Sequence, residues 1–466
     1  MTQDERWEIR YKEVKGFIEE NHRNPSKHRI EEHDMLNWVK QQRKLLNAGR
    51  LKAERMEAFE KLLVLCEKYR RVNQTCEHDG SHCLKTLKKV VMLQPFEYYF
   101  VFSRHKRKDS YRMKYLNIKK ALEAWRGLQP LTEKDRDRLS RRFTVDFNYN
   151  SNHIEGNTLT YGQTEILLLF GKVIGEANVR DVQEMTASNV GLKMMTEEAA
   201  VKEMPLTQNF IRTLHKTLLR EDYTVYRNLP GQQTSYTVHA GQYKTRPNSV
   251  ITRYGDRFEY ASPEETPGLM TDLVDWYNKA EKEGKLSPVE LAALFHYRYI
   301  RIHPFEDGNG RIARLMVNFI LTRHDYPMIV VRSRKKSEYL EALHQADIEV
   351  GPLPSDGAHA EIKDIRPFLK YFNELVATEV YNDVLFVSEK DENVWWYDGE
   401  RIAFRTPNYT KLLNAMRTQP TLTLADMREE TGISIAAIQK LLDQLISKKY
   451  VERGEKDGSW RVFVTQ

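Results

Sequence analysis

The sequence predicts a mainly α-helical protein in which one short strand-like interval interrupts a series of helices. Apolar residues recur at helical spacing through most of the chain, as Leu291, Leu294 and Phe295 illustrate. Residues 241–263 differ, because β-branched residues lie between turn residues there. With 466 residues, the chain is long enough for two to four domains.

Residues 1–75 are expected to form three helices. Trp7, Val14 and Ile18 lie at helical spacing in the first of them. The pattern LNWVKQQRKLLNAGRL…RMEAFEKL resembles the helicase-associated module, a small three-helix unit, which implies nucleic-acid binding. The segment carries seventeen basic and thirteen acidic side chains, so its charge gives that role little support.

Residues 76–109 form a basic, aromatic-rich linker region. Eleven Lys or Arg and two acidic residues fall within residues 84–120, between aromatic side chains. Such a segment can follow a nucleic-acid backbone, or it can be a solvated surface over a small core, and both interpretations stay open. The same holds for a metal site formed by four potential ligands whose spacing matches no common zinc pattern: Cys76, His78, His82 and Cys83.

The segment His303–Arg311, HPFEDGNGR, is expected to lie between two helices of a large domain that covers residues 110–375. Ser287, Pro288 and Glu290 form a capping-box pattern at the start of the preceding helix. The helix after the segment opens within GNGRIARLMVNFILTRH. The nonapeptide therefore ends at a helix N-terminus, where free N–H groups and the helix dipole attract anions.

The residue types in this segment suit a nucleotide polyphosphate. Gly308 and Gly310 let backbone N–H groups approach an anion closely. Arg311 and Arg314 are suited to gripping phosphate, and Asp307 offers oxygen ligands for magnesium. An imidazole beside such a site, that of His303, can take the proton from an attacking hydroxyl.

HPFEDGNGRIAR resembles the Fic family motif HxFx(D/E)GNGRxxR at every defined position. The resemblance implies a helical Fic domain with a short β-hairpin flap, which transfers AMP from ATP, with Mg²⁺, to a Ser, Thr or Tyr hydroxyl of a protein. It also implies a role for each residue: His303 as the base, Phe305 as the loop anchor, Asp307 as the magnesium ligand, Gly308, Asn309 and Gly310 as phosphate contacts, and Arg311 and Arg314 at the terminal phosphates.

Three further segments fit the same resemblance. SNHIEG, from Ser151 to Gly156, resembles the family's inhibitory pattern (S/T)xxxE(G/N), which implies that Glu155 pairs with Arg314 and acts as a brake. The flap is expected at 241–263, with its turn at Gly255-Asp256, and would hold the target by β-augmentation. Tyr339 resembles an aromatic near the adenine pocket, or else takes part in ordinary helix packing.

The remaining residues are predicted to form a connector, 376–405, and a winged-helix-like domain, 406–466. Gly432 is the expected turn between two helices, the second of which starts near Ser434, and two strands come after them. Nine basic and seven acidic residues leave open whether this domain contacts DNA or protein.

Composition favours a cytoplasmic protein that neither spans a membrane nor depends on disulfides. There are three cysteines, no apolar run of about 18 residues, and a charged start that does not resemble a signal peptide. Three functions stay open: an autoinhibited AMP transferase, an enzyme that removes AMP with Glu155 positioning water, and a nucleic-acid-binding regulator that senses ATP. The target protein and the oligomeric state also stay open.

Overall fold

The computed structural model describes residues 3–25, 32–47, 51–68, 117–229, 232–251, 257–419, 421–453 and 460–462. The chain divides into two compact units, residues 1–104 and 105–466. The linker residues predicted at 76–109, including the four potential zinc ligands, lie outside the described residues.

The first unit contains the three predicted helices: α1 Gln3–Asn21, α2 His33–Asn47 and α3 Ala53–Lys68. Val14 and Ile18 of α1 are fully buried with Phe59 of α3. The indole Nε1 of Trp7 donates a hydrogen bond to Gln42 Oε1 at 2.8 Å, which links α1 to α2. The helical periodicity in the sequence therefore identified this module.

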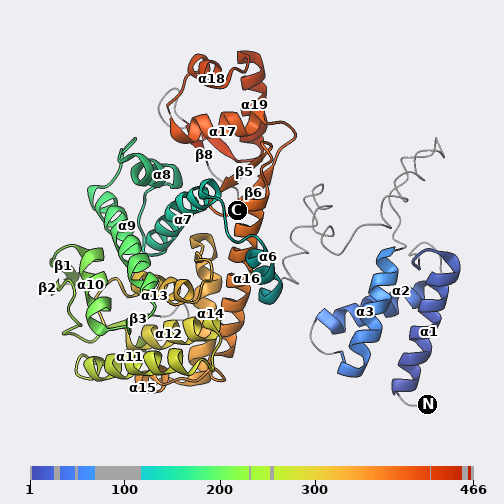
Figure 1. Ribbon diagram of the computed structural model, residues 1–466, viewed down its shortest axis with the longest axis horizontal. Helices are drawn as coiled ribbons and strands as arrows, with labels where there is room; N and C mark the ends of the chain where they lie inside the picture. Colours follow the sequence, from blue (N-terminus) through green and yellow to red (C-terminus); the bar gives the residue numbers. More distant parts are fainter. Residues whose placement is uncertain are drawn as a thin grey trace. The chain divides into compact units, whose positions relative to one another are not determined.

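The second unit is built from helices around a central pair, α12 and α13, with α9 and α11 packed beside them (Figure 1). Its helices are α6 Ile118–Gly127, α7 Glu133–Ile154, α8 Tyr161–Phe170, α9 Val179–Ala200, α10 Gln208–Leu219, α11 Thr266–Glu283, α12 Pro288–Ile302, α13 Asn309–Arg323, the 3-10 helix η3 Ser333–Lys335, α14 Lys336–Val350, α15 Pro354–Ala358, α16 Arg366–Ser388, α17 Asn408–Thr418, α18 Leu424–Thr431 and α19 Ile435–Ser447. The mainly helical fold is as predicted.

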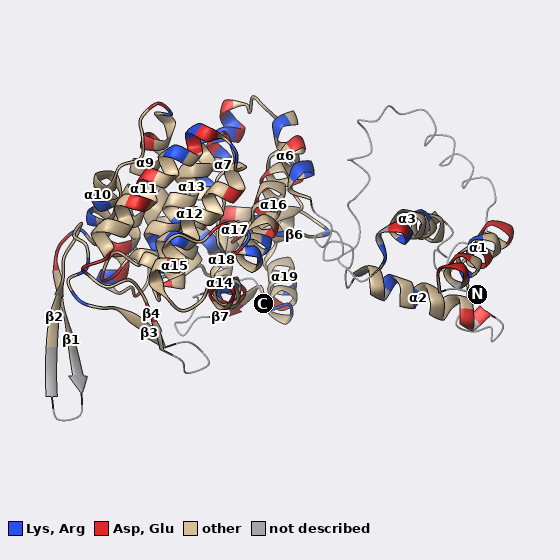
Figure 2. Cartoon of the chain, turned by 90° about the horizontal axis from the view of Figure 1, so that it is seen from below, with Lys and Arg blue, Asp and Glu red and all other residues tan. Residues whose placement is uncertain are grey.

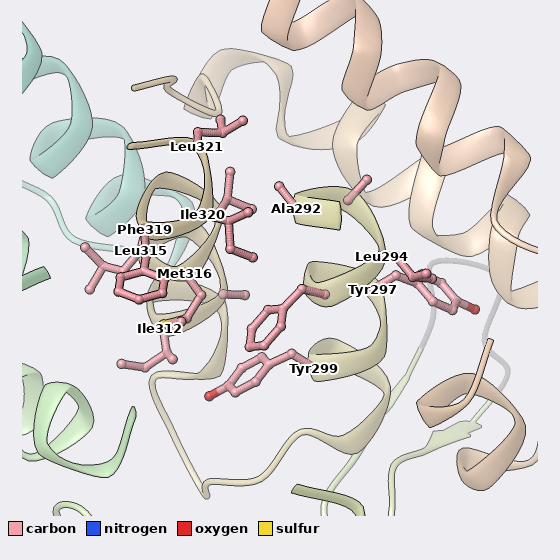
Figure 3. Close-up of a cluster of buried hydrophobic side chains, with 14 of the residues drawn as sticks. Ala292, Leu294, Tyr297, Tyr299, Ile312, Leu315, Met316, Phe319, Ile320 and Leu321 are labelled. Carbon is pink, nitrogen blue, oxygen red and sulfur yellow. The ribbon is translucent and has the colours of Figure 1, made fainter. Parts of the chain in front are cut away.

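The central helix pair shares a continuous apolar interface. Figure 3 shows Tyr299 of α12 and Ile312 and Met316 of α13 pointing toward one another, whereas Leu294 and Tyr297 lie on the opposite side of α12. All five side chains are at most 3% exposed, so α12 is buried on both sides. Such a closely packed pair holds the loop between its helices in a fixed place.

One strand-like interval was predicted within residues 110–375 and two strands near the C-terminus, and the described residues form four antiparallel hairpins, two of them within 110–375. They are β1 Tyr223–Leu229 with β2 Gln232–Val238, β3 Ser249–Ile251 with β4 Arg257–Glu259, β5 Val394–Tyr397 with β6 Glu400–Ala403, and β7 Val451–Arg453 with β8 Trp460–Val462. The hairpin β3–β4 lies within the predicted flap, and its predicted turn, Gly255-Asp256, lies outside the described residues. Figure 2 shows β1 and β2 extending away from the helices.

The C-terminal residues have the predicted order of two helices and two strands, preceded by a further helix, α17. Gly432, with φ 71°, ends α18, and Ser434 caps α19. The predicted domain boundary at residue 375 falls inside the continuous helix α16. Moreover, the β5–β6 hairpin and α17–α19 share one buried cluster with Val145 of α7 and Tyr161 of α8. No helix in the described ranges is long and apolar enough to cross a membrane.

Candidate active site

The loop between α12 and α13 is shaped by two residues in the left-handed backbone region. His303, with φ 52°, ends α12, and Gly308, with φ 77°, begins α13. The capping box of Ser287 and Glu290 at the other end of α12 is present, as predicted. Asn309 closes the loop from within: its Oδ1 accepts a hydrogen bond from Phe305 N at 3.0 Å, and its Nδ2 donates one to Phe305 O at 2.7 Å.

Phe305 anchors the loop in the core by stacking on the imidazole of His215. The ring centroids are 3.7 Å apart, the planes differ by 4°, and Phe305 has no exposed surface. His215 Nδ1 accepts from Gly241 N at 2.9 Å, so the proton is on Nε2, which donates to Asp307 O at 2.9 Å. Burial lowers the pKa of His215 to about 4, which keeps this imidazole neutral.

The carboxylate of Asp307 is held at the mouth of the loop by neighbours on both oxygens. Gly308 N donates to Oδ1 at 2.6 Å, and the Tyr223 hydroxyl at the base of β1 donates to Oδ2 at 2.5 Å. Arg311 Nη2 lies 3.6 Å from Oδ2. Partial burial opposes ionisation, but Arg311 and these hydrogen bonds outweigh it and lower the pKa of Asp307. The side chain is 40% exposed and ionised, as a metal ligand must be.

The first turn of α13 combines free backbone N–H groups with two buried arginines. Arg311 and Arg314 are each 3% exposed. Within the part of the chain that the structure describes, Arg311 Nε has no hydrogen-bond partner. A buried cation with an unpaired donor beside an ionised carboxylate and a helix N-terminus fits a polyphosphate carrying a divalent cation. The residues present therefore suit both ATP and Mg²⁺.

His303 stacks on Tyr260, with ring centroids 3.9 Å apart and planes 9° apart. Burial and the nearby Lys244 ammonium lower the pKa of His303 to about 3, so the imidazole is neutral in this state. Lys244 Nζ donates to the carbonyl oxygens of Ile302 and His303, at 3.0 and 2.9 Å. These two hydrogen bonds hold the backbone of His303 in place.

The structure brings Glu155 and Arg314 together although 159 residues separate them. Arg314 Nη2 donates to Glu155 Oε1 at 2.6 Å and to Ser151 O at 2.8 Å, and Arg314 Nε donates to Ser151 Oγ at 3.0 Å. Ser151 lies in the last turn of α7, and Glu155 ends that helix immediately before Gly156, whose φ is 100°. A Cβ at Gly310 would lie 2.3 Å from Glu155 Oε1, so the carboxylate lies directly against the glycine turn.

Tyr339 lies in the core beneath Arg314. Its ring is 3% exposed, and its hydroxyl is 2.8 Å from His296 Nε2. Together with His296, Arg314 and apolar residues of α13 and α16, it lines a small pocket. The contact with an adenine stays a prediction.

Four residues that hold the site were missed in the sequence: His215, Tyr223, Lys244 and Tyr260. His215 lies on α10 and Tyr223 on β1, whereas Lys244 lies between the two hairpins that precede α11 and Tyr260 directly follows β4. Each contacts the loop from 43 to 92 positions away along the chain, as the separations of the Tyr260–His303 and His215–Asp307 contacts illustrate. For Tyr223 a local signal was present, because alternating strand-like residues flank Pro230-Gly231.

Comparison with known proteins gives family matches to an N-terminal and to a central segment of the chain. The model of the Fic/DOC family matches residues 205–321, and that of the helicase associated domain matches residues 4–64, which confirms the N-terminal resemblance. A solved Fic domain containing signaling protein from Bacteroides thetaiotaomicron is 53% identical, with a TM-score of 0.55, and the match covers 59% of this chain and 99% of that one.

Two curated relatives are similar over about half of this chain. Protein adenylyltransferase fic-1 of Caenorhabditis elegans is 31% identical over 235 residues, which is 50% of this chain and 40% of the relative. Protein adenylyltransferase Fic of Nematostella vectensis is 30% identical over 223 residues, which is 48% of this chain and 44% of the relative. The matched part thus spans less than half the length of these relatives.

Proposed function

This chain belongs to the Fic/DOC family, and from that membership we propose that it is an autoinhibited protein adenylyltransferase. It would move AMP from ATP to a hydroxyl group of a protein, either a separate target or itself. The observation that carries the proposal is the position of the Glu155 carboxylate, which is bonded to Arg314 and lies against Gly310. The Glu155 carboxylate thus lies where the glycine turn of α13 would bind a phosphate group.

The transfer step needs a base, an aligned phosphate and charge neutralisation. His303 takes the proton from the acceptor hydroxyl, the oxygen attacks the α-phosphorus of ATP, and pyrophosphate leaves. The place of His303 at the end of α12, beside the first turn of α13, supports this role. Asp307 would hold magnesium, which when bound neutralises charge on the polyphosphate.

The phosphates would be bound by the first turn of α13. The glycines at 308 and 310 let an anion approach the backbone N–H groups of Asn309 and Gly310, while Gly308 N is bonded to Asp307, and Arg311 and Arg314 supply positive charge in a site with little solvent. In the resting state Arg314 is bonded to Ser151 and Glu155 instead. ATP could then bind with its terminal phosphate displaced and its α-phosphorus poorly aligned for attack.

The test is incubation of the protein with magnesium and ATP labelled on the α-phosphate, with wild type, Glu155→Gly and Glu155→Gly/His303→Ala compared side by side. Label on protein should rise in the single variant and be lost in the double variant. The same variants mixed with an AMP-modified acceptor would reveal the opposite activity, removal of AMP. Label that is retained in the double variant at the level of Glu155→Gly would exclude His303 as the base.

A further inference from the structure

The last turn of α7, which carries the residues that bind Arg314, is held by elements that come much later in the chain. Asn150 Nδ2 donates to Asp398 Oδ1 at 2.6 Å, and Asn150 Oδ1 accepts from Ser333 N at 2.7 Å. Lys336 Nζ donates to Ile154 O at 2.6 Å. Asn150 immediately precedes Ser151, so these bonds lie one residue from the contact with Arg314.

Asp398 lies at the tip of the β5–β6 hairpin. Asp398 and Gly399 have φ values of 45° and 73° and form a two-residue turn between paired Tyr397 and Glu400. A Cβ at Gly399 would lie 2.4 Å from Arg332 Cζ, so the turn presses against a buried guanidinium. A side chain at this position would push the tip away from its partners.

Arg332 extends the same contact to α7. Its Nη1 donates to Asp146 Oδ2 at 2.9 Å and to Asp398 Oδ1 at 3.3 Å, and its Nη2 donates to Glu379 Oε2 at 2.5 Å. Asp146 lies on α7, one turn before Asn150. The hairpin tip therefore contacts α7 both directly and through a buried arginine that is 3% exposed.

The hairpin in turn is fixed by the C-terminal helices. Trp395 and Tyr397 of β5 are buried in one cluster with Leu412 and Met416 of α17 and with residues of α18 and α19. Trp395 Nε1 donates to Asn414 Oδ1 at 2.9 Å. A shift of these helices would consequently move the hairpin tip.

We propose that Asp398 is a positioning residue for the inhibitory contact between Glu155 and Arg314. The C-terminal helices α17–α19 act through Asp398 to set how often Glu155 leaves Arg314. The inference rests on the proposed adenylyltransferase and extends its regulation to the β5–β6 hairpin. A charge-assisted hydrogen bond shifts an equilibrium by about ten- to a hundredfold. Loss of the Asp398 carboxylate should release Glu155 more often by a factor of that order.

The experiment compares Asp398→Ala with a matched control, Glu392→Ala, in the full chain. Glu392 is exposed and lies two residues before β5, so the control removes a carboxylate close to the same hairpin. Transfer of labelled AMP is measured in wild type and in the Glu155→Gly background, and hydrogen exchange is measured for amides 150–156. Asn150→Ala removes the same hydrogen bond from the α7 side, and it replaces Asp398→Ala in the experiment if that variant does not fold.

In the otherwise wild-type chain, Asp398→Ala should raise the rate of AMP transfer about tenfold or more over Glu392→Ala. It should also speed hydrogen exchange at amides 150–156. In the Glu155→Gly background, Asp398→Ala should change the rate of AMP transfer less than about twofold. Two results would overturn parts of this scheme separately. If Glu155→Gly activates while neither Asp398→Ala nor Asn150→Ala does, the positioning role is refuted. If Glu155→Gly itself does not activate, the autoinhibition is refuted, and the positioning role with it.

Discussion

Replacing Glu155 by glycine removes one of the three hydrogen bonds on the Arg314 guanidinium. Two bonds to Ser151 remain, so Arg314 should stay near its present position. The Glu155 side chain is 39% exposed, and for a pair this open to water the loss of stability should be only about 1 kcal/mol. The effect on rate should be much larger, because an aligned α-phosphate is worth on the order of a hundredfold.

We therefore expect Glu155→Gly to raise the initial rate of AMP transfer by about a hundredfold with a small decrease in Tm. Glu155→Gln, which keeps the length and an acceptor oxygen without the charge, should give an intermediate rate. Incorporation of label from α-labelled ATP gives the rates, with thermal unfolding as the control for folding. If folded Glu155→Gly protein transfers no faster than wild type to itself or to any acceptor, Glu155 is not a brake.

Three further outcomes are expected from the geometry of the site. In the Glu155→Gly background, His303→Ala should lower the rate of AMP transfer by a factor of about 10²–10⁴, while the ATP affinity measured by calorimetry stays within about threefold. A transfer rate that stays within about twofold of the parent variant would contradict the role of His303 as base. Asn309→Ala should lower transfer at least about tenfold, because both bonds to the Phe305 backbone are lost; unchanged rates at unchanged Tm would show that the loop holds without them. Acid should destabilise the fold: burial lowers the pKa values of His215 to about 4 and of His296 and His303 to about 3, below the 6.5 of an unfolded histidine, so the unfolded state binds more protons. The stability present above pH 6.5 should fall by about 1.4 kcal/mol per pH unit per histidine on acidification toward these values, and urea unfolding at pH 7.5 and 5.5 that gave equal stability would refute this.

The local geometry of the loop between α12 and α13 could be predicted from the sequence because its determinants are local. The capping box at Ser287 and the glycines around Asn309 act within a few residues, and they place the loop between two helices as expected. The approach of Glu155 to Arg314 could be expected only from the family pattern. No local property of SNHIEG indicates that it lies against a turn 159 residues away.

The supports around the loop could not be predicted, because they depend on tertiary contacts between polar side chains. In the sequence His215 is one histidine on an amphipathic helix, yet its two nitrogens join Gly241 to Asp307. The sequence around Lys244 suggests an exposed lysine, but this side chain is 3% exposed and caps the end of α12. Residue 375 lies inside α16, whose buried residues Phe368 and Val380 belong to one core, and no local sequence signal indicates that the helix continues past it.

The uninterrupted course of α16 limits how this gene could have gained or exchanged its C-terminal part. Each residue added to a helix rotates the downstream chain by about 100° and advances it by about 1.5 Å. A single codon inserted between Arg366 and Ser388 would therefore rotate every later element, including the Asp398 turn that must meet Arg332. Even an insertion of seven residues, which restores the rotation to within about 20°, would advance the chain by about 10.5 Å and separate the Asp398 turn from Arg332, so the length of α16 is fixed by the contacts at both of its ends.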